Sequence, residues 1–520
     1  MPTSASLGEE GKGSLVDPPR IPITDPFWQP RIKGILRNIV SFTFIVILLL
    51  LLADMSYLSG SAYHERDRIH ALKVLVVDND GSDIGEAVKG AYSALKADTF
   101  VSLEWPDSTQ NYRSEPAARE AVCKTKYWGA VYINSGATDR LDSAVNGTDT
   151  PATPYDAANA ITYVYNAVRW PAIASLISAD LQTLVVASRS AYYHTPGGAK
   201  ALQTLNSSNS AAVSAYVNPI SATADIIQPT NQGSDGFFTT VNMLIPQLVA
   251  VFINIILNMS MMMENIFRDM RIRDVWTIRF VTGKIYAVFA GLAVAGYIWA
   301  FREDWDVSAG QFFETWLVYI LFLDINWQVY DSLLGSYIPL AWISLFIITW
   351  ILVNLASCNL PMELQAGWYR VGWAFPAHST WLLLVQVWSG CANRDYQALP
   401  ILFSWWVVGH AVTPISTRKR CADARKPDAL AALGATGQPA GAAEVAAPKP
   451  ASLSEPPESG EKGRMGTHTA SGDPEGTAHT GGSQSTASGE VTDPDSVTRH
   501  EDVSSVPRAS GSTGTVGEAS

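Results

Sequence analysis

The spacing of its apolar segments constrains this 520-residue chain more than any other feature. One apolar run covers residues 35–55, a mixed stretch follows over residues 56–236, and a cluster of apolar runs occupies residues 237–414. Most of these runs approach the ~20 residues with which a helix crosses the hydrocarbon core of a bilayer. The pattern predicts an α-helical polytopic membrane protein with one large water-facing domain between its first two helices.

The apolar runs divide the chain into six predicted transmembrane helices. The first covers residues 35–55, and the other five cover residues 237–263, 285–301, 311–330, 338–356 and 397–414. A further apolar stretch, residues 381–388, is too short to cross, so we expect it to be re-entrant or interfacial.

The two ends of the chain are expected to be cytosolic. Residues 1–34 form the predicted N-terminal segment, and residues 415–520 form a tail of Gly, Ser, Thr, Pro, Ala and acidic residues. A segment of this composition buries too little apolar surface to fold, so we expect the tail to be disordered.

Lysine and arginine cluster on one side of the predicted spans, at residues 31–37, 268–284 and 418–426. Cytosolic loops are enriched in these residues. An even number of spans with both termini in the cytosol places all three clusters there. The domain formed by residues 56–236 then lies outside the cytosol.

Two glycosylation sequons support this orientation, and a cleaved signal peptide is the alternative to the first span. Asn146 and Asn206 each begin an N-glycosylation sequon within the predicted outer domain, which agrees with an extracytosolic position. Alternatively, the first run is a signal peptide cleaved near the small residues 60–62, but it starts late and is long for such a signal.

The outer domain alternates between strand and helix patterns. Strands are predicted at residues 72–78, 99–105 and 128–133, and helical spacing appears at residues 84–95 and 115–124. Small and apolar residues then recur at helical spacing over residues 155–205. This alternation predicts a small α/β domain.

No enzymatic motif is convincing, so we expect no catalytic residues, no metal and no cofactor. Asp78 and Asp80 follow a buried strand, as in phosphotransferases that hold Mg²⁺, but the later acidic pair of such enzymes is missing. A turn in which Asp80 and Ser82 compete to cap the next helix is the alternative that we favour. No phosphate-binding Gly-x-x-x-x-Gly-Lys-Ser/Thr loop occurs, and the acidic net charge of −12 argues against nucleic acid.

Polar residues inside the predicted spans are the candidates for a substrate path. They are Asp324, Glu314, Gln247, Asn254 and Asn258. Carboxylates within a membrane usually face the bundle interior or an aqueous path. Hydrogen-bonded packing between helices is the alternative, and for His410, near the end of its span, we expect an interfacial hydrogen bond.

The four cysteines are too scattered for a disulfide scaffold or a zinc site. Cys358 and Cys391 bracket the segment between the last two spans on its predicted outer side, and they form a possible disulfide. Cys421 is expected to be free in the cytosol.

Several segments, in the same order, resemble the fungal nitrosoguanidine-resistance proteins, a family of unknown function related to ABC-2-type permeases and bacterial phage-infection proteins. The matching segments are residues 75–81 (LVVDNDG), 127–133 (YWGAVYI), 229–232 (PTNQ) and 354–364 (NLASCNLPMEL), within a similarity that covers residues 31–417. The pattern expected before the last span is kept only in part, around residues 388–393.

The resemblance implies a protein of the plasma membrane or secretory pathway that promotes resistance to toxic small molecules. Export of an amphipathic compound or lipid is the leading hypothesis, energised by a separate ATPase or an ion gradient, and a homodimer is plausible by analogy with related permeases. The alternative is a non-transporting regulator or scaffold that affects lipid organisation or partner proteins. The family supplies no catalytic residues.

Overall fold

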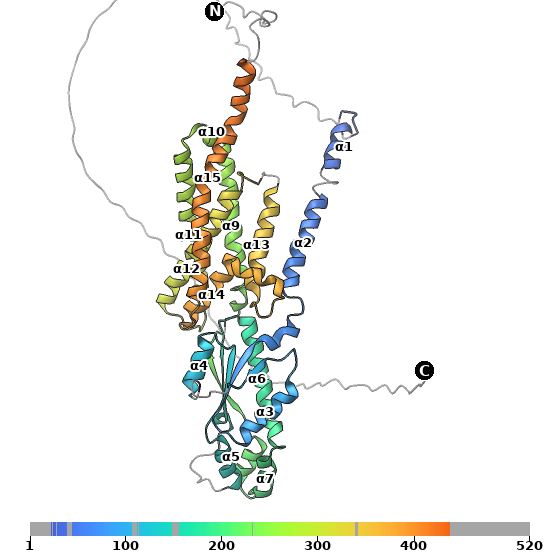
Figure 1. Cartoon of the computed structure of the whole chain (residues 1–520), viewed down its shortest axis with the longest axis vertical. Helices are drawn as coiled ribbons and strands as arrows, with labels where there is room; N and C mark the ends of the chain where they lie inside the picture. Colours follow the sequence, from blue (N-terminus) through green and yellow to red (C-terminus); the bar gives the residue numbers. More distant parts are fainter. Residues whose placement is uncertain are drawn as a thin grey trace, which may run out of the picture. The chain divides into compact units, whose positions relative to one another are not determined.

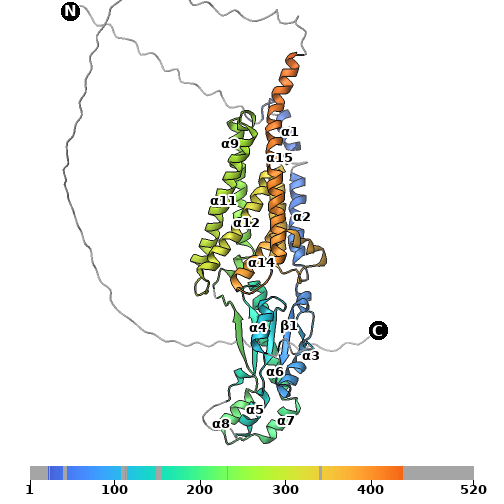
Figure 2. The ribbon, with the colours of Figure 1, turned by 60° about the vertical axis from the view of Figure 1, so that its left-hand side comes forward.

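The computed structural model describes residues 22, 24–27, 29–38, 44–106, 112, 114–147, 155–230, 232–338 and 342–436. Residues 39–43 of the predicted first span and residues 437–520 of the predicted tail lie outside this range. Over the described residues the chain forms a helical bundle and a five-stranded sheet domain (Figures 1 and 2).

The bundle consists mainly of long helices. Its elements are α1 (Gln29–Asn38), α2 (Ile45–Ser61), α9 (Val241–Met263), α10 (Ile266–Asp269), α11 (Ile272–Ala300), α12 (Ala309–Leu333), α13 (Ile343–Asn359), η7 (Gly367–Ala374), α14 (Pro376–Ser389) and α15 (Asp395–Thr436). The helix α15 continues to Thr436, so residues 415–436, which the sequence predicted to belong to a disordered tail, are helical. The run of Ala and charged residues after the apolar part favours a continued helix, because these residues have high helix propensity.

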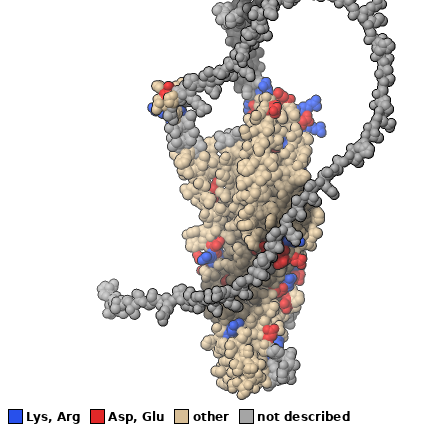
Figure 3. Space-filling model, turned by 180° about the vertical axis from the view of Figure 1, so that it is seen from behind, with Lys and Arg blue, Asp and Glu red and all other residues tan. Residues whose placement is uncertain are grey.

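Four described helices are long and apolar enough to cross a membrane: α6 (Pro171–Tyr192), α9, α11 and α15 up to residue 426. The helices α2 and α13 are also apolar but shorter. Outward-facing side chains of the bundle, such as Phe252, Phe289 and Leu317, are large, apolar and exposed, as a lipid-facing surface requires. On the face shown in Figure 3, charged residues gather at one end of the bundle and over the sheet domain, with few between them.

The sheet has the strand order β2-β1-β3-β4-β5 and one antiparallel pair, β3 with β4. Its strands are β1 (Lys73–Asp78), β2 (Ser102–Glu104), β3 (Gly129–Ile133), β4 (Ile161–Asn166) and β5 (Ala222–Ile227). The predicted strands at residues 72–78 and 128–133 are confirmed by β1 and β3, and the one at residues 99–105 is shortened to β2. The sequence missed β4 and β5.

Helices cover both faces of the sheet. The helix α4 (Glu115–Cys123) packs on β3 and β4 on one side, and α6 packs against α3 (Asp83–Leu95) on the other. The remaining elements of the domain are α5 (Ala137–Asn146), α7 (Pro196–Thr204), α8 (Ser210–Val217) and the 3-10 turns η2 (Arg66–Ala71), η4 (Ala157–Asn159) and η5 (Asp235–Phe237).

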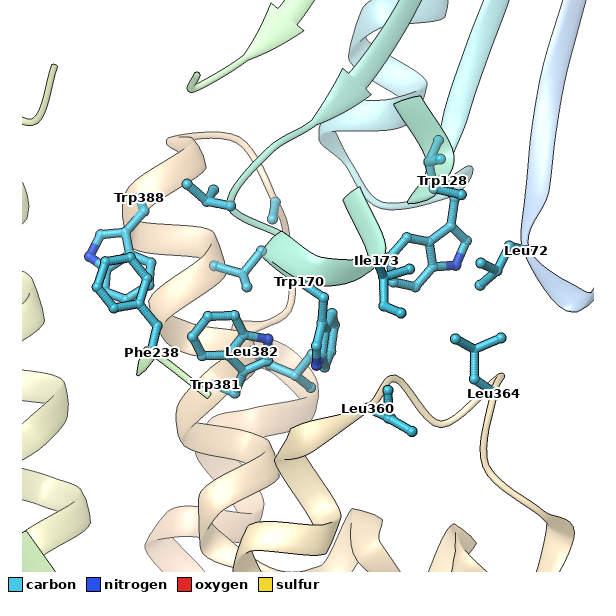
Figure 4. Packing of buried hydrophobic residues seen from close by; sticks show 14 of the residues in the cluster. Leu72, Trp128, Trp170, Ile173, Phe238, Leu360, Leu364, Trp381, Leu382 and Trp388 are labelled. Atoms are coloured by element: carbon cyan, nitrogen blue, oxygen red, sulfur yellow. The ribbon is translucent and has the colours of Figure 1, made fainter. Parts of the chain in front are cut away.

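A continuous apolar core joins the sheet domain to the bundle (Figure 4). Trp170, immediately before α6, packs against Trp128 of the sheet domain and Trp381 of α14, with ring centroids 5.9 and 5.8 Å apart. Its indole N–H donates to the Cys358 carbonyl at 3.1 Å, and the indole of Trp381 donates to the Arg169 carbonyl at 3.0 Å. Because these indole groups are both buried and hydrogen-bonded, they fix how α6 meets α14.

Candidate functional site

The helix α12 is the central element of the bundle, since it packs against α9, α11, α14 and α15. Its C-terminal half is buried although it is rich in polar residues. Hydrogen bonds connect these residues to surrounding helices: Asn326 to Trp350, Gln328 to Thr413 and Tyr330 to Gln247. In the N-terminal half, the Thr315 hydroxyl accepts from the Trp388 indole. Because an unpaired polar group is costly in apolar surroundings, these bonds specify the position of each neighbouring helix.

The predicted residue Asp324 lies in an ionic cluster formed by Lys284 of α11, Asp324 of α12, and Trp406 and His410 of α15, hereafter the Asp324 cluster. Lys284 forms a salt bridge with Asp324. His410 Nε2 lies 2.7 Å from Lys284 Nζ and 3.7 Å from Asp324 Oδ2. Trp406 donates its indole N–H to Asp324 Oδ2 at 2.8 Å. Three helices thus converge on one buried carboxylate.

The hydrogen bonds of His410 assign its protonation. Its Nδ1 lies 2.7 Å from the Trp406 carbonyl, which can only accept, so Nδ1 carries the proton. Nε2 then accepts from the Lys284 ammonium. This arrangement differs from the interfacial hydrogen bond expected for His410, and it places a proton-accepting imidazole beside an ion pair.

The Asp324 cluster opens to the bundle surface between α11 and α15. The Asp324 side chain is 4% exposed, whereas the Lys284 side chain is 31% exposed. A buried anion is therefore connected to the outside through one partly exposed cation.

A second ionic cluster, hereafter the Arg279 clamp, lies deeper among the helices and contains Arg279, Asp331 and Arg420. Arg279 Nε donates to Asp331 Oδ1 at 2.6 Å, and Arg420 donates to both the carboxylate and the carbonyl of Asp331. The side chains of all three residues are at most 4% exposed. Two guanidinium groups thus share one carboxylate, and Arg420 also binds a carbonyl at the C-terminal end of α12, where the helix dipole favours cations.

Two residues of the polar stripe of α9 contact the Arg279 clamp, and the third contacts α12. Gln247 accepts a hydrogen bond from Tyr330, Asn254 from Arg279, and Asn258 from Arg420 at 3.0 Å. All three stripe residues are buried. Their contacts are those of helix packing, and their predicted role along a substrate path stays a prediction. Asn258, although part of a sequon, lies inside the bundle.

Glu314, the other predicted carboxylate, is not part of either cluster. It lies near the start of α12 and is exposed. The structure therefore separates Glu314 from Asp324, although both belong to one helix.

The cationic members of both clusters were not predicted as buried site residues. Arg279, Lys284 and Arg420 were assigned to loops at the cytosolic surface, but Arg279 and Arg420 are buried within helices and Lys284 is half-buried. One signal was available: Asp324 and Asp331 are seven residues apart, which places two carboxylates on one helix face.

The Asp78–Asp80 turn has structural bonds. Asp80 accepts from the backbone N–H of Thr138 at the start of α5, and Asp78 accepts from the Gly81 N–H at 2.9 Å. Neither Asp80 nor Ser82 caps α3 as expected. The Thr138 hydroxyl accepts from the Ile84 N–H there instead. Among the described residues no group of three or more His, Cys, Asp or Glu side chains could hold a metal ion.

The predicted pairing of Cys358 with Cys391 was wrong. Cys391 forms a disulfide with Cys123 at the end of α4, with 5.5 Å between their Cα atoms, and Cys358 is free and buried. Sequence position suggested which cysteines share a side of the membrane, but not that α4 reaches the segment after α14. Beside the disulfide, Arg394 donates to the hydroxyl and carbonyl oxygens of Thr125, so two bonds join the sheet domain to this segment.

Thiol counting tests this disulfide. We expect only two of the four cysteines to react with a maleimide in the unreduced, denatured protein, and all four after reduction. Cys391→Ser should release Cys123 for labelling and lower the free energy of unfolding of the junction by about 2–4 kcal/mol. Cys358→Ser is the control, since it should leave Cys123 protected. Labelling of Cys123 in the Cys358→Ser protein would contradict the pairing.

Both predicted glycosylation residues lie at the end of the sheet domain away from the bundle. Asn146 ends α5, Asn206 follows α7, and both are exposed. The Asn206 N–H donates to the Val145 carbonyl at 3.1 Å, so the two sequons are neighbours.

Comparison with known proteins places this architecture in a family. No curated protein and no solved structure matches the chain. A family described as "Protein of unknown function (DUF3533)" matches residues 43–411, which include α2, the sheet domain, the whole Asp324 cluster, and Arg279 and Asp331 of the Arg279 clamp. The chain belongs to this DUF3533 family.

Proposed function

We propose that this chain is a non-enzymatic multi-pass membrane protein that exports an amphipathic compound or lipid and thereby promotes resistance to toxic small molecules. The observation that carries the proposal is the Asp324 cluster, an ion pair and an imidazole held by three apolar helices. Ionisable groups at membrane depth are costly, and in membrane proteins they usually mark substrate or ion pathways.

The position of the Asp324 cluster suits an amphipathic substrate. Lys284 is partly exposed on α11, and the exposed apolar residues Val281 and Val288 share its helix face. On α15, Val407 is exposed three residues before His410. A molecule with an apolar body and a polar group can keep its body in lipid while its polar group meets Lys284. In this proposal Asp324 and His410 respond to the substrate or to a proton, while Gln247, Asn254 and Asn258 hold α9 in place.

The proposed topology has six spans, a cytosolic N-terminus and tail, and an extracytosolic sheet domain. Two observations support it. The Arg425 Nε donates to the Arg268 carbonyl at 2.8 Å, so two of the basic segments meet at one end of the bundle. The disulfide at the opposite end suits an oxidising compartment such as the secretory pathway or the cell surface.

Glycosylation tests this orientation. We expect the protein from eukaryotic cells to lose mass when treated with an N-glycosidase, and Asn146→Gln with Asn206→Gln to abolish that loss. Asn258→Gln is the matched control and should leave the loss of mass on glycosidase treatment unchanged. A mass that glycosidase leaves unchanged in the unsubstituted protein, made in glycosylating cells, would argue for the reverse orientation.

The experiment that tests the function is intracellular accumulation of a nitrosoguanidine-type alkylator in cells with and without the protein, at known surface abundance. Export is supported if the protein lowers the accumulation of the alkylator and if this difference is lost when the cells are de-energised. Because the sequence has no phosphate-binding loop, the energy then comes from a partner ATPase or an ion gradient. Equal accumulation would reject export and favour a regulator of lipid organisation.

A further inference from the structure

A pocket lies where the sheet domain meets the bundle, outside the Asp324 cluster. Its polar lining comes from Arg169 before α6, Glu363 between α13 and η7, His378 in the first turn of α14, and Arg394 before α15. The rings of Trp170 and Trp373 form apolar walls. The enclosed space is about 20 Å³, room for one group the size of a water molecule or an ammonium, and the space that includes the open mouth is about 370 Å³. The pocket therefore combines cations, an anion and aromatic faces.

His378 points to a ligand in this pocket. Its Nδ1 lies 2.9 Å from the Ser357 carbonyl and must donate to it, so Nε2 is left as an acceptor. Nε2 is buried and has no hydrogen-bond partner among the described residues, and the His378 residue is only 1% exposed. Burial lowers the pKa of His378 to about 4, so the ring is neutral at physiological pH and Nε2 keeps its lone pair. An ordered water or the N–H of a bound ligand can supply the donor that this buried nitrogen lacks.

Arg169 keeps unused donors. Each guanidinium nitrogen of Arg394 already donates one hydrogen bond, to Thr125 or Gln397, so that only one N–H on each of its two terminal nitrogens is left for a ligand. Arg169 stacks on Trp128, with its guanidinium carbon 3.6 Å from the ring centroid, and donates to the Tyr127 carbonyl at 2.9 Å. Its Nη2 is 3.9 Å from the Glu363 carboxylate, which is longer than a direct hydrogen bond. Burial lowers the pKa of Arg169 to about 9, so it remains protonated at neutral pH. Arg169 can therefore bind an anion while it keeps its contacts with Trp128 and the Tyr127 carbonyl.

Thr125 shows that this junction is held in a costly conformation. It is buried and adopts φ of +58°, which is unfavourable for a β-branched residue. Arg394 holds it there through two hydrogen bonds. The pocket wall is thus fixed by a strained residue, which is typical of binding sites.

The surroundings of the pocket fit a membrane surface. The 3-10 helix η7 exposes Trp368, Val371 and Trp373 next to the pocket, with Trp368 76% exposed. Tryptophan side chains are enriched at the level of lipid head groups. A pocket between this helix and a water-facing domain lies where head groups are available.

We propose that this pocket binds a phosphorylated primary amine, the chemistry of a phosphoethanolamine head group, and that the source is a membrane phospholipid. Arg169 and Arg394 bind the phosphate, and the ammonium donates to the Glu363 carboxylate and to His378 Nε2 while it faces the Trp373 ring. A trimethylated head group has no N–H to donate, so the pocket selects the primary amine. The proposal does not depend on transport, because it concerns binding at equilibrium.

Native mass spectrometry of the full chain tests the proposal, with the protein released from nanodiscs that contain equal amounts of phosphatidylethanolamine and phosphatidylcholine. We expect retention of phosphatidylethanolamine over phosphatidylcholine by about tenfold, the effect of one charged hydrogen bond. Glu363→Gln and His378→Asn should each abolish this preference. Asparagine can still donate to the Ser357 carbonyl but lacks the outer acceptor.

Control variants separate loss of binding from loss of folding. His378→Gln restores an acceptor near the Nε2 position and should recover part of the preference, and Glu264→Gln, at the other end of the bundle, should keep all of it. Binding of soluble O-phosphoethanolamine without lipid preference would support the amine-phosphate pocket but assign it to a free ligand. Equal retention of both lipids with no binding of O-phosphoethanolamine would overturn the proposal.

Discussion

Asp331→Asn is expected to destabilise the bundle more than any other single substitution considered for this chain. The change leaves Arg279 and Arg420 buried together without an anion, because Asp331 is the carboxylate that both arginines contact. Removing one partner from a buried ionic cluster typically costs about 3–5 kcal/mol. We expect a clearly lower unfolding temperature in nanodiscs and a sharp fall in surface abundance.

A double variant that keeps the net charge of the Arg279 clamp is the control for this prediction. The double variant Arg279→Gln with Asp331→Asn has the same net charge in the clamp as the unsubstituted protein, so it should regain part of the lost stability. Asp423→Asn removes a carboxylate of α15 whose partners, Lys419 and Lys426, lie at the surface. Because exposed salt bridges contribute little to stability, this variant should leave the unfolding temperature almost unchanged. An Asp331→Asn protein as stable as the Asp423→Asn protein would show that the clamp is not a stabilising contact.

The order of apolar helices and the α/β domain along this chain could be predicted because apolar runs and buried strands leave strong local sequence patterns. The continuous β-branched run of β1 and the short run of β3 were recognisable by composition alone. The strand β4 was missed because its residues 161–166 lie within a longer stretch of small and apolar residues that also suits a helix. Only pairing with β3 and β5 distinguishes the two, and pairing is a long-range property.

The candidate site was predicted only in part, for a similar reason. Asp324 was identified because a carboxylate inside an apolar run is locally conspicuous. Lys284 and Arg420 were assigned to cytosolic loops because they lie near the ends of apolar runs, where cations are common. Their burial depends on how far α11 and α15 extend beyond the apolar runs and pack against each other. A local sequence pattern does not contain this information. The partner of Cys391 was hidden in the same way, since Cys123 is in another domain.

Under the proposed export function, Asp324→Asn is expected to abolish export while leaving the protein at the cell surface. The substitution removes the anion between Lys284 and His410, so the Asp324 cluster can no longer exchange a proton or bind a cationic group. Unlike the Arg279 clamp, this cluster contains a cation that is 31% exposed and can turn toward water or lipid head groups when its partner is lost. Folding should therefore survive. Accumulation of the alkylator should rise to the level of cells that lack the protein.

Two further variants distinguish a transport role for Asp324 from a structural one. Glu314→Gln changes an exposed carboxylate on the same helix and should leave accumulation unchanged. His410→Asn keeps a donor for the Trp406 carbonyl but removes the acceptor that faces Lys284, so it should weaken export at unchanged abundance. If Asp324→Asn and His410→Asn both export as well as Glu314→Gln does, the cluster is a packing contact between α11, α12 and α15. Its buried charge would then specify helix positions, as the Arg279 clamp does, and the substrate path would have to lie elsewhere in the bundle.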